Sequence, residues 1–168
     1  MADPEVWLRG PMPGVPPLLM PAAQALAGAG EDVARAAAGL TPEQLWARPA
    51  GVASVGFHLR HIVGILDRLL TYARGNPLTE AQLAYLRAEG DSGDPPASAD
   101  ELLSAVARAV EGALAQIRET REDQLLAPRG VGRLQLPSTV MGLIFHAAEH
   151  AQRHTGQVIT LSRIVRGG

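Results

Sequence analysis

The chain has 168 residues, of which 46% are hydrophobic, 4% aromatic and 19% charged, and its formal net charge is -2. This length suits one domain with a substantial core, and the near-neutral charge gives no electrostatic case for a nucleic-acid partner. Cysteine is absent, which excludes disulfides, thiolate metal ligands and a cysteine nucleophile. Without a basic N-terminal region or a long apolar run, we expect neither a signal peptide nor a membrane span, and hence a cytoplasmic protein.

The first part of the chain is rich in proline. Six prolines fall within residues 1–21, and because each one removes a backbone donor and fixes φ, they predict an extended arm over about residues 1–20. We expect this arm to pack on a single domain that spans residues 1–168. Its candidate anchors are apolar: Trp7, Leu8, Val15, Leu18 and Leu19.

An alanine-rich run from about Pro21 to Leu40 predicts the first long helix, which we expect to end near Gly39. The next residues, Thr41-Pro42-Glu43-Gln44, place threonine at an N-cap, proline at the first helical position and glutamine three residues after the cap. This capping-box pattern predicts a brief helical connection that stops before Pro49.

The second long helix is predicted from about Ser54 to Arg74, where a Gly-Asn-Pro sequence ends it. On a helical wheel, His58 falls inside the apolar arc of this helix, whereas His61 lies roughly 90° from its middle. A shorter helix should follow from Glu80 to about Glu89, before a breaker sequence rich in glycine and proline.

A second capping box at Ser98 predicts the third long helix, which runs to about Thr120. Residues 121–137 contain two prolines and two glycines and predict a loop with at most a short extended piece. No run is strong enough to predict a sheet. The fourth long helix should begin at Ser138 and continue to about Arg163.

Four long helices with capped ends predict an all-α protein, a four-helix bundle. The link between the first and second helices is short, which suits antiparallel neighbours. The link between the second and third is long enough to cross the bundle, so these two helices should run parallel. The second and fourth helices are then antiparallel, and their histidines can meet at one level.

The five histidines lie in two clusters, one on each of these two helices. His146, His150 and His154 are spaced at i, i+4 and i+8, so they project from one helix face within about 80°. Two of them can share an ion with a histidine from the second helix, His58 or His61. Three neutral ligands make an open site, whose remaining position takes water or substrate and strongly acidifies it.

Other uses of histidine fit this sequence less well. Buried histidines can be satisfied core residues, hydrogen-bonded to each other, but burying five in two clusters without a ligand is costly. Haem is disfavoured because the chain has no Cys-x-x-Cys-His sequence and few aromatic residues. A ferritin-like di-iron site needs Glu-x-x-His motifs, whereas Glu149 sits directly beside His150.

Two arginines are candidate contacts for an anionic group of a substrate, Arg68 and Arg153, because each lies on the histidine side of its helix. The alternative is that both are solvated or snorkelling side chains. Asp67 and Glu149 project away from the ligand faces and are expected to be surface charges.

The segments 54–62, 67–69 and 149–157 carry a family resemblance. The last one reads Glu-His-Ala-Gln-Arg-His-Thr-Gly-Gln and is similar to the His-x3-His-(Arg)-Gly-Gln ending of the DinB/YfiT-like family of small metal-binding four-helix bundles. The resemblance spans roughly residues 20–165. It implies an up-down-down-up bundle and frequently a homodimer.

The resemblance also implies a ligand set, His61, His150 and His154, with His58 and His146 as alternates. It implies one divalent ion, zinc or nickel first, with iron or manganese also compatible with such a site. The activities known in the family are thiol-dependent: S-transfer from low-molecular-weight thiols such as mycothiol or bacillithiol, and maleylpyruvate isomerisation.

Three functions follow as hypotheses. The first is a metal-dependent enzyme resembling a thiol S-transferase, in which the ion deprotonates a co-substrate thiol and so provides the nucleophile that a cysteine-free chain lacks. The second is a hydrolase that uses the ion to activate water. The third is a non-catalytic, stress-related metal-binding dimer. We expect a small-molecule partner and neither nucleic acid nor a membrane.

Overall fold

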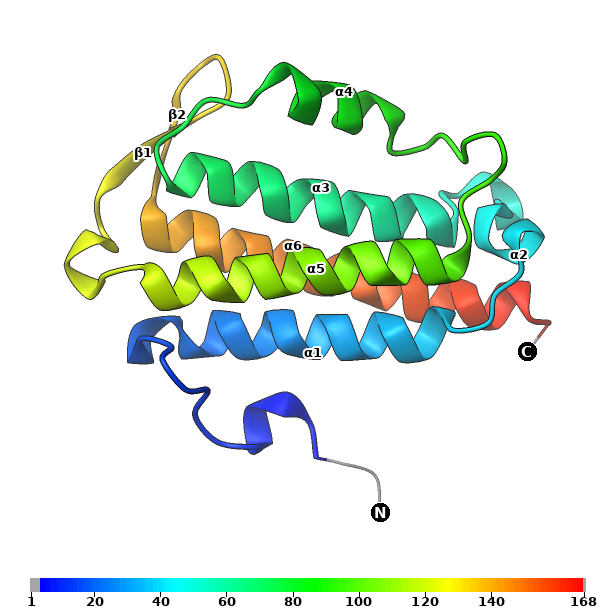
Figure 1. The fold of residues 1–168 in the computed structure, drawn as a ribbon, viewed down its shortest axis with the longest axis horizontal. Coiled ribbons are helices and arrows are strands. Elements are labelled where there is room, and N and C mark those ends of the chain that lie inside the picture. Colours follow the sequence, from blue (N-terminus) through cyan, green and yellow to red (C-terminus); the bar gives the residue numbers. More distant parts are fainter. Residues whose placement is uncertain (1–3, 168) are drawn as a thin grey trace.

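The structure, a computed structural model, describes residues 4–167 and is mostly helical. Four long helices lie side by side: α1 (Met20–Ala37), α3 (Val55–Ala73), α5 (Ala99–Glu119) and α6 (Val140–Val165) (Figure 1). In this view α1 and α6 run from left to right, and α3 and α5 run from right to left. None of the helices within residues 4–167 combines the length and the apolar character needed to cross a membrane.

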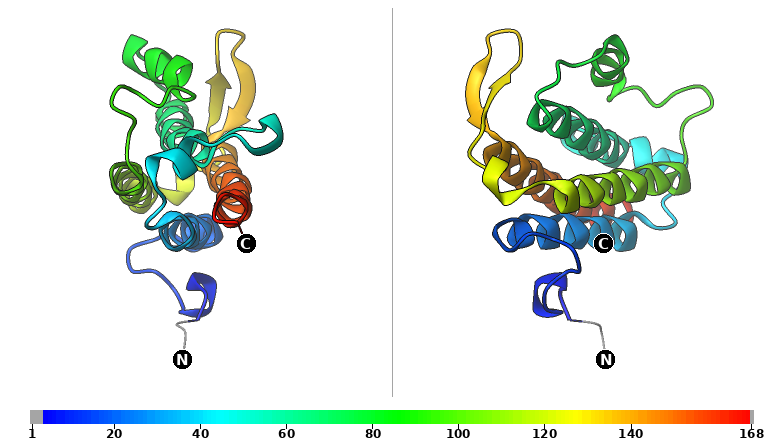
Figure 2. Two further views of the ribbon diagram at one scale, coloured as in Figure 1. Left: turned by 90° about the vertical axis from the view of Figure 1, so that its right-hand side faces the viewer. Right: turned by 60° about the vertical axis from the view of Figure 1, so that its left-hand side comes forward.

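The four helices form a square in cross-section (Figure 2). Helix α3 packs against α5 and α6, and α1 packs against the same two helices, so that α1 and α3 stand at opposite corners. The expectation that the first two long helices are neighbours was therefore wrong. Their link contains α2 (Pro42–Trp46) and the short turn Pro49–Gly51, and it is long enough to cross the end of the bundle.

Capping side chains explain where the helices begin. Thr41 and Ser98 form the predicted capping boxes, and Thr79 forms another at the start of α4 (Glu80–Ala88). Ser54 and Thr139 accept hydrogen bonds from the third backbone N–H of α3 and α6. Each such cap satisfies a donor that would otherwise lack a partner and stabilises its helix by about 1 kcal/mol.

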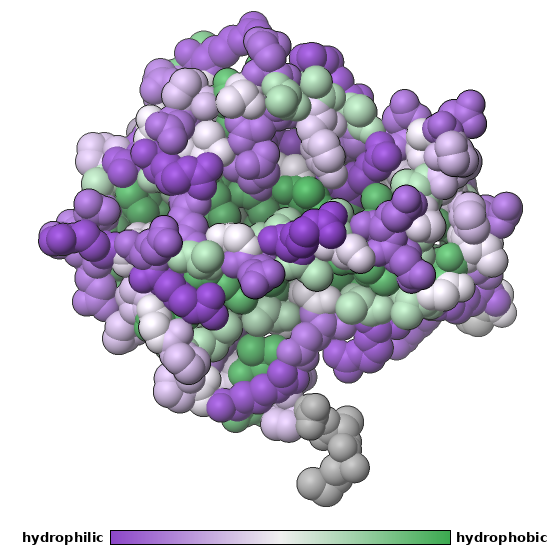
Figure 3. Space-filling model, in the orientation of Figure 1, coloured by the Kyte–Doolittle hydropathy of each residue, from purple (hydrophilic) through white to green (hydrophobic). Residues whose placement is uncertain are grey.

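The core fills the space between the four long helices. Its largest fully buried side chains include Leu26 and Val33 of α1, Leu59 of α3, Ile117 of α5 and Ile144 of α6. Burying an aliphatic side chain of this size contributes roughly 1.5–3 kcal/mol, so this shared core holds α3 and α6 in fixed register. On the face that α5 occupies, most of the surface is hydrophilic, and patches of hydrophobic surface show between the hydrophilic side chains (Figure 3).

A two-stranded hairpin corrects the expectation of a loop without a sheet. Strand β1 (Pro128–Val131) pairs antiparallel with β2 (Leu136–Thr139), with Val131 opposite Leu136 at the turn. Each strand has only four residues, too few for an alternating pattern to stand out in the sequence. The connecting turn uses positive φ angles at Gly132 and Gln135, and glutamine is an unusual residue in that conformation.

The arm is less extended than predicted. It contains two short 3₁₀ turns, Val6–Leu8 and Pro17–Leu19, before α1 begins. Of the expected anchors, Val15 and Leu19 are buried, whereas three were wrong because their side chains face solvent: Trp7, Leu8 and Leu18. An ion pair between Arg9 and Glu31 of α1, at 2.6 Å, holds the arm on the domain.

Candidate metal centre

Three histidines meet where α3 and α6 pack together. His61 comes from α3, and His150 and His154 come from successive turns of α6. The Nε2 atom of His150 lies 3.0 Å from that of His61 and 3.1 Å from that of His154. Two histidines four residues apart on one helix and one on an antiparallel neighbour thus bring their ring nitrogens to one point.

The nitrogen spacing fits a metal ion. Tetrahedral ligand atoms that lie 2.0–2.1 Å from an ion are separated by about 3.3 Å, close to the spacing of these Nε2 atoms. One ligand atom from each of the three rings falls within 4.8 Å of the others. Among residues 4–167 only these three side chains form the group, so an ion held there would keep at least one position open for a small molecule.

The cluster favours neutral imidazole rings, the form that binds metals. Burial lowers the pKa of His154 to about 3, and neighbouring histidines add to the effect. Burial also lowers the pKa of His150, and it lowers the pKa of His58 to about 4. These rings are therefore neutral at neutral pH, so a metal does not have to compete with the second proton of a charged imidazolium.

The second ring nitrogen of His61 faces a buried carboxylate. The Nδ1–H group of His61 donates to Glu89 Oε2 at 2.6 Å, and Arg68 donates to Glu89 Oε1 at 2.6 Å. Metal-binding histidines generally make such a bond, which fixes the tautomer and orientation of the ring. Sequence reasoning missed Glu89, because nothing in the sequence shows that the end of α4 folds back onto α3.

The two alternate histidines occupy different surroundings. His58 is buried, as the wheel indicated, and its Nδ1 lies 2.8 Å from Nδ1 of His154, on the edge of that ring that points away from the cluster. His146 is half exposed, with Nδ1 3.3 Å from Glu149 Oε2. His146, Glu149 and His150 form a second group that could hold an ion, but this group shares His150 with the first.

Comparison with known proteins identifies the family. A family model described as the DinB superfamily matches residues 25–158. The chain belongs to the DinB superfamily. A solved structure, the crystal structure of the conserved protein of locus from Enterococcus faecalis, has a TM-score of 0.68 and 19% identity, and the match covers 89% of this chain and 98% of that one. At this identity the likeness shows the fold alone. No curated protein matches.

In this DinB superfamily protein the two candidate arginines differ. Arg68 is buried beneath α4, and its guanidinium binds Glu89, so the expectation of a solvated or substrate-facing side chain is corrected. Arg153 is exposed on α6 and forms an ion pair with Glu149 one turn earlier. Only Arg153 is therefore placed where a dissolved molecule can reach it.

An aromatic ring borders the histidine cluster. Phe57 stacks on the ring of His61, with centroids 5.5 Å apart and planes inclined by 16°. Four residues along α3, one helical turn, separate the two side chains, so the stack forms within the helix itself. Because one face of the His61 ring is covered by Phe57 and Nδ1 is bonded to Glu89, the ring has little freedom to rotate.

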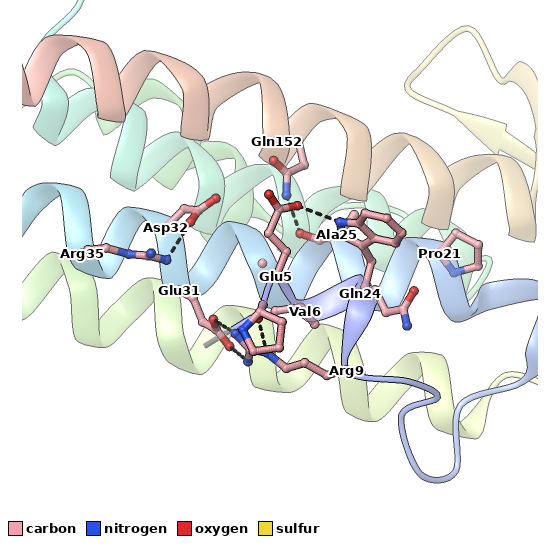
Figure 4. Close-up of a pocket in the computed structure, with 13 residues that line it drawn as sticks. Glu5, Val6, Arg9, Pro21, Gln24, Ala25, Glu31, Asp32, Arg35 and Gln152 are labelled. Atoms are coloured by element: carbon pink, nitrogen blue, oxygen red, sulfur yellow. Dashed lines mark hydrogen bonds and ion pairs between the residues drawn. The ribbon is translucent and has the colours of Figure 1, made fainter. Parts of the chain in front are cut away.

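A cavity of about 950 Å³ lies elsewhere, between the arm, α1 and α6 (Figure 4). On its α6 side is Gln152, whose amide donates to the carbonyl of Ala25 at 2.7 Å. Gln152 is two residues from His150 and therefore about 200° away around the helix. The cavity and the histidine cluster thus lie on opposite faces of α6.

Proposed function

We propose that the protein binds one divalent ion through His61, His150 and His154 and acts as a metal-dependent enzyme of the thiol S-transferase type. The observation that carries the proposal is the convergence of three Nε2 atoms, with no fourth side-chain ligand in the group from the part of the chain that the structure describes. Such a site leaves room for a reacting molecule, whereas structural zinc sites are closed by four protein ligands. Family membership supports the same reading.

The arrangement of the helices is part of this proposal. We infer that α1, α3, α5 and α6 form the up-down-down-up bundle that the family resemblance implies, with α4 in the long crossover between α3 and α5. This topology makes α3 and α6 antiparallel, so a histidine in the first half of α3 meets two near the middle of α6. The homodimer and the small-molecule partner that the resemblance implies belong to the proposal as well.

Imidazole ligands suit several divalent metals, with zinc and nickel first and iron or manganese as alternatives. When bound, the ion supplies Lewis acidity that lowers the pKa of a thiol or of water. Because the chain contains no cysteine, a sulfur nucleophile has to come from a co-substrate, for which a low-molecular-weight thiol of the mycothiol or bacillithiol kind is the natural choice.

The protein's own side chains have distinct roles in this proposal. The three histidines hold the ion, and Phe57 covers one face of His61, which limits the access of water from that side. Arg153 stands one residue before His154 and is exposed, so it can exchange its partner Glu149 for an anionic group of the substrate. It would then orient the thiol or the electrophile at the open position.

The test is turnover with purified protein loaded with zinc or nickel. We expect the reaction of a thiol with an electrophile such as monobromobimane to run faster than the uncatalysed rate only when the metal is present, and this acceleration to be lost in His150→Ala. His146→Ala is the matched control, because it removes a histidine of the same helix that lies outside the group of three.

Two outcomes would redirect the proposal. Ester hydrolysis that depends on the metal but is indifferent to thiol would show a hydrolase, since the same ion acidifies water. Metal binding without turnover across a broad panel of thiols, electrophiles and esters would contradict an enzymatic role and leave a non-catalytic metal-binding protein.

A further inference from the structure

The buried carboxylate of Glu89 occupies a notch in α3 that only glycine leaves open. Glu89 caps the C-terminal end of α4 and lies against α3 at Gly64. A Cβ atom at position 64 would overlap Glu89 Oε1 and would stand 2.5 Å from Nη1 of Arg68. Gly64 therefore provides the space in which Glu89 and Arg68 form their ion pair beside His61.

Stability alone does not account for this pair. Glu89 is 3% exposed and Arg68 is 6% exposed, and moving both charges out of water costs free energy that their attraction only partly offsets. Helix α4 itself buries no residue. Polar contacts attach it to α3, among them Tyr85 to the Arg60 carbonyl and Arg60 to the Ala88 carbonyl. A neutral apolar contact would hold α4 at lower cost.

The pair delivers a negative charge to one histidine of the cluster. Glu89 uses Oε1 for Arg68 and Oε2 for His61, so both of its oxygens are engaged. By contrast, the second nitrogen of His154 meets a neutral ring, His58, and within residues 4–167 that of His150 has no hydrogen-bond partner. The three histidines of the group are therefore supported unequally.

The geometry points to Glu89 as a positioning residue of the metal centre, held in place by Arg68 and admitted by Gly64. It keeps the His61 proton on Nδ1, which leaves the lone pair of Nε2 free for the ion. This inference rests on the proposed metal site. It makes the crossover that carries α4 a part of that site.

The substitution Glu89→Gln tests the hydrogen-bond direction with almost no change in shape. Arg68 needs an acceptor, so the amide oxygen of glutamine stays with Arg68 and its NH₂ group faces His61. The His61 Nδ1 must then accept, which moves the ring proton to Nε2, the atom that should bind the metal. Glutamine thus fills the same space as glutamate but leaves a proton on the Nε2 atom that should bind the metal.

The first measurement is metal affinity, determined by competition with a chromophoric chelator using zinc and cobalt. Glu89→Gln should bind about 10–100-fold more weakly than wild type, the range typical for loss of such a supporting group. Glu80→Gln, an exposed carboxylate at the other end of α4, should bind as wild type does. Equal affinity of a folded Glu89→Gln protein and wild type would overturn the inference.

The second measurement is the tautomer of His61 in metal-free protein, read from ¹⁵N NMR of labelled histidine. Wild type should carry the proton on Nδ1 and Glu89→Gln should carry it on Nε2. A wild-type proton on Nε2 would overturn the inference. This result does not depend on metal binding, so failure of wild type to bind any ion would refute the proposed function while the tautomer still decides the role of Glu89.

A glycine substitution provides an independent test. Gly64→Ala should displace Glu89 and weaken metal binding about as much as Glu89→Gln. Combining the two should add little further loss, because both remove the same contact. Gly112→Ala in α5 is the control, since a Cβ there meets nothing within 4 Å. Additive losses in the double variant would contradict a shared cause.

Discussion

The two faces of α6 present two different kinds of site. On one face the cavity beneath the arm has ample volume, but its charged groups already satisfy one another: Arg9 pairs with Glu31, and Arg35 pairs with Asp32 (Figure 4). On the other face three clustered histidines bring their Nε2 atoms together, with that of His150 3.0 Å from His61 and 3.1 Å from His154. The candidate ligand site is therefore distinguished by the convergence of ring nitrogens from neutral histidines, and not by the volume of a cavity.

The electrostatics of the two regions differ in the same way. Under the arm, the hydrogen bond from Arg9 lowers the pKa of Glu31, because the negative charge of this carboxylate is already paired with the guanidinium. In the cluster, burial lowers the pKa values of His150 and His154, which favours the neutral rings that can bind a metal. The charges of the first region are therefore satisfied within the protein, whereas the second region presents three ring nitrogens that could hold an ion.

The largest expected effect separates the two faces directly. His150 contacts both other ligands, so His150→Ala should weaken zinc binding by more than the roughly 10–100-fold that follows loss of a supporting group. Gln152→Ala, two residues away on the cavity face, should leave affinity unchanged. Chelator competition measures both. Equal losses of zinc affinity in the two variants would show that the histidine face has no special role in metal binding.

Removal of the metal should lower thermal stability. An ion present at a hundredfold excess over its dissociation constant stabilises the folded state by about 2.7 kcal/mol. For a chain of this size that corresponds to a fall in Tm of about 5–10 °C on chelation, given roughly 2–4 °C per kcal/mol. Calorimetry with and without a chelator tests this. An unchanged Tm would mean that no ion is bound to the folded state.

The metal-free protein should lose stability as the pH falls. The folded pKa values of His154 and His58, about 3 and about 4, lie below the usual value of 6.5, so below pH 6.5 the unfolded chain binds more protons. The stability contributed by the neutral rings is thus fully present above pH 6.5 and is lost as the pH falls towards 4 and 3, by up to about 1.4 kcal/mol per pH unit for each ring.

Urea denaturation of the metal-free protein between pH 7.5 and pH 5 measures this dependence. His58→Gln should reduce the slope, because it removes one of the two buried rings. His146→Gln should not, because that side chain is half exposed. A urea midpoint that does not change between pH 7.5 and pH 5 would show that protonation of the buried rings does not destabilise the folded state.

The smallest effect is expected on the cavity face. Glu31→Gln removes the ion pair with Arg9, whose two side chains are 38% and 44% exposed, and pairs of this kind contribute about 0–1 kcal/mol. Urea denaturation should therefore show a small loss that shrinks at high salt, with metal affinity unaltered. A loss of several kcal/mol would mean that the arm has a larger structural role than its contacts indicate.

Local signals in the sequence predicted the helices well. The capping boxes at Thr41 and Ser98 and the Gly-Asn-Pro stop after Arg74 lie at the observed ends, because caps act within a few residues of their own position. The spacing of His150 and His154 likewise depends only on the helical repeat. Such features can be read without knowing what packs against them.

Features that depend on distant segments could not be read in this way. The wheel placed His58 in the apolar arc but could not show that its ring lies behind His154 rather than beside His61. The partnership of Glu89 with Arg68 and His61 requires α4 to return across α3, which no local pattern encodes. The exposure of Trp7 similarly reflects the path of the arm over α1 and not the apolar character of the side chain.

Elemental analysis of the purified protein, equilibrated with zinc or nickel and freed of excess ion, tests the central claim most directly. The account predicts one divalent ion per chain in wild type and in Gln152→Ala, and none retained in His61→Ala or His150→Ala. Wild-type protein that retains no ion after purification without chelators, or ligand variants that retain it as fully as wild type does, would contradict the account.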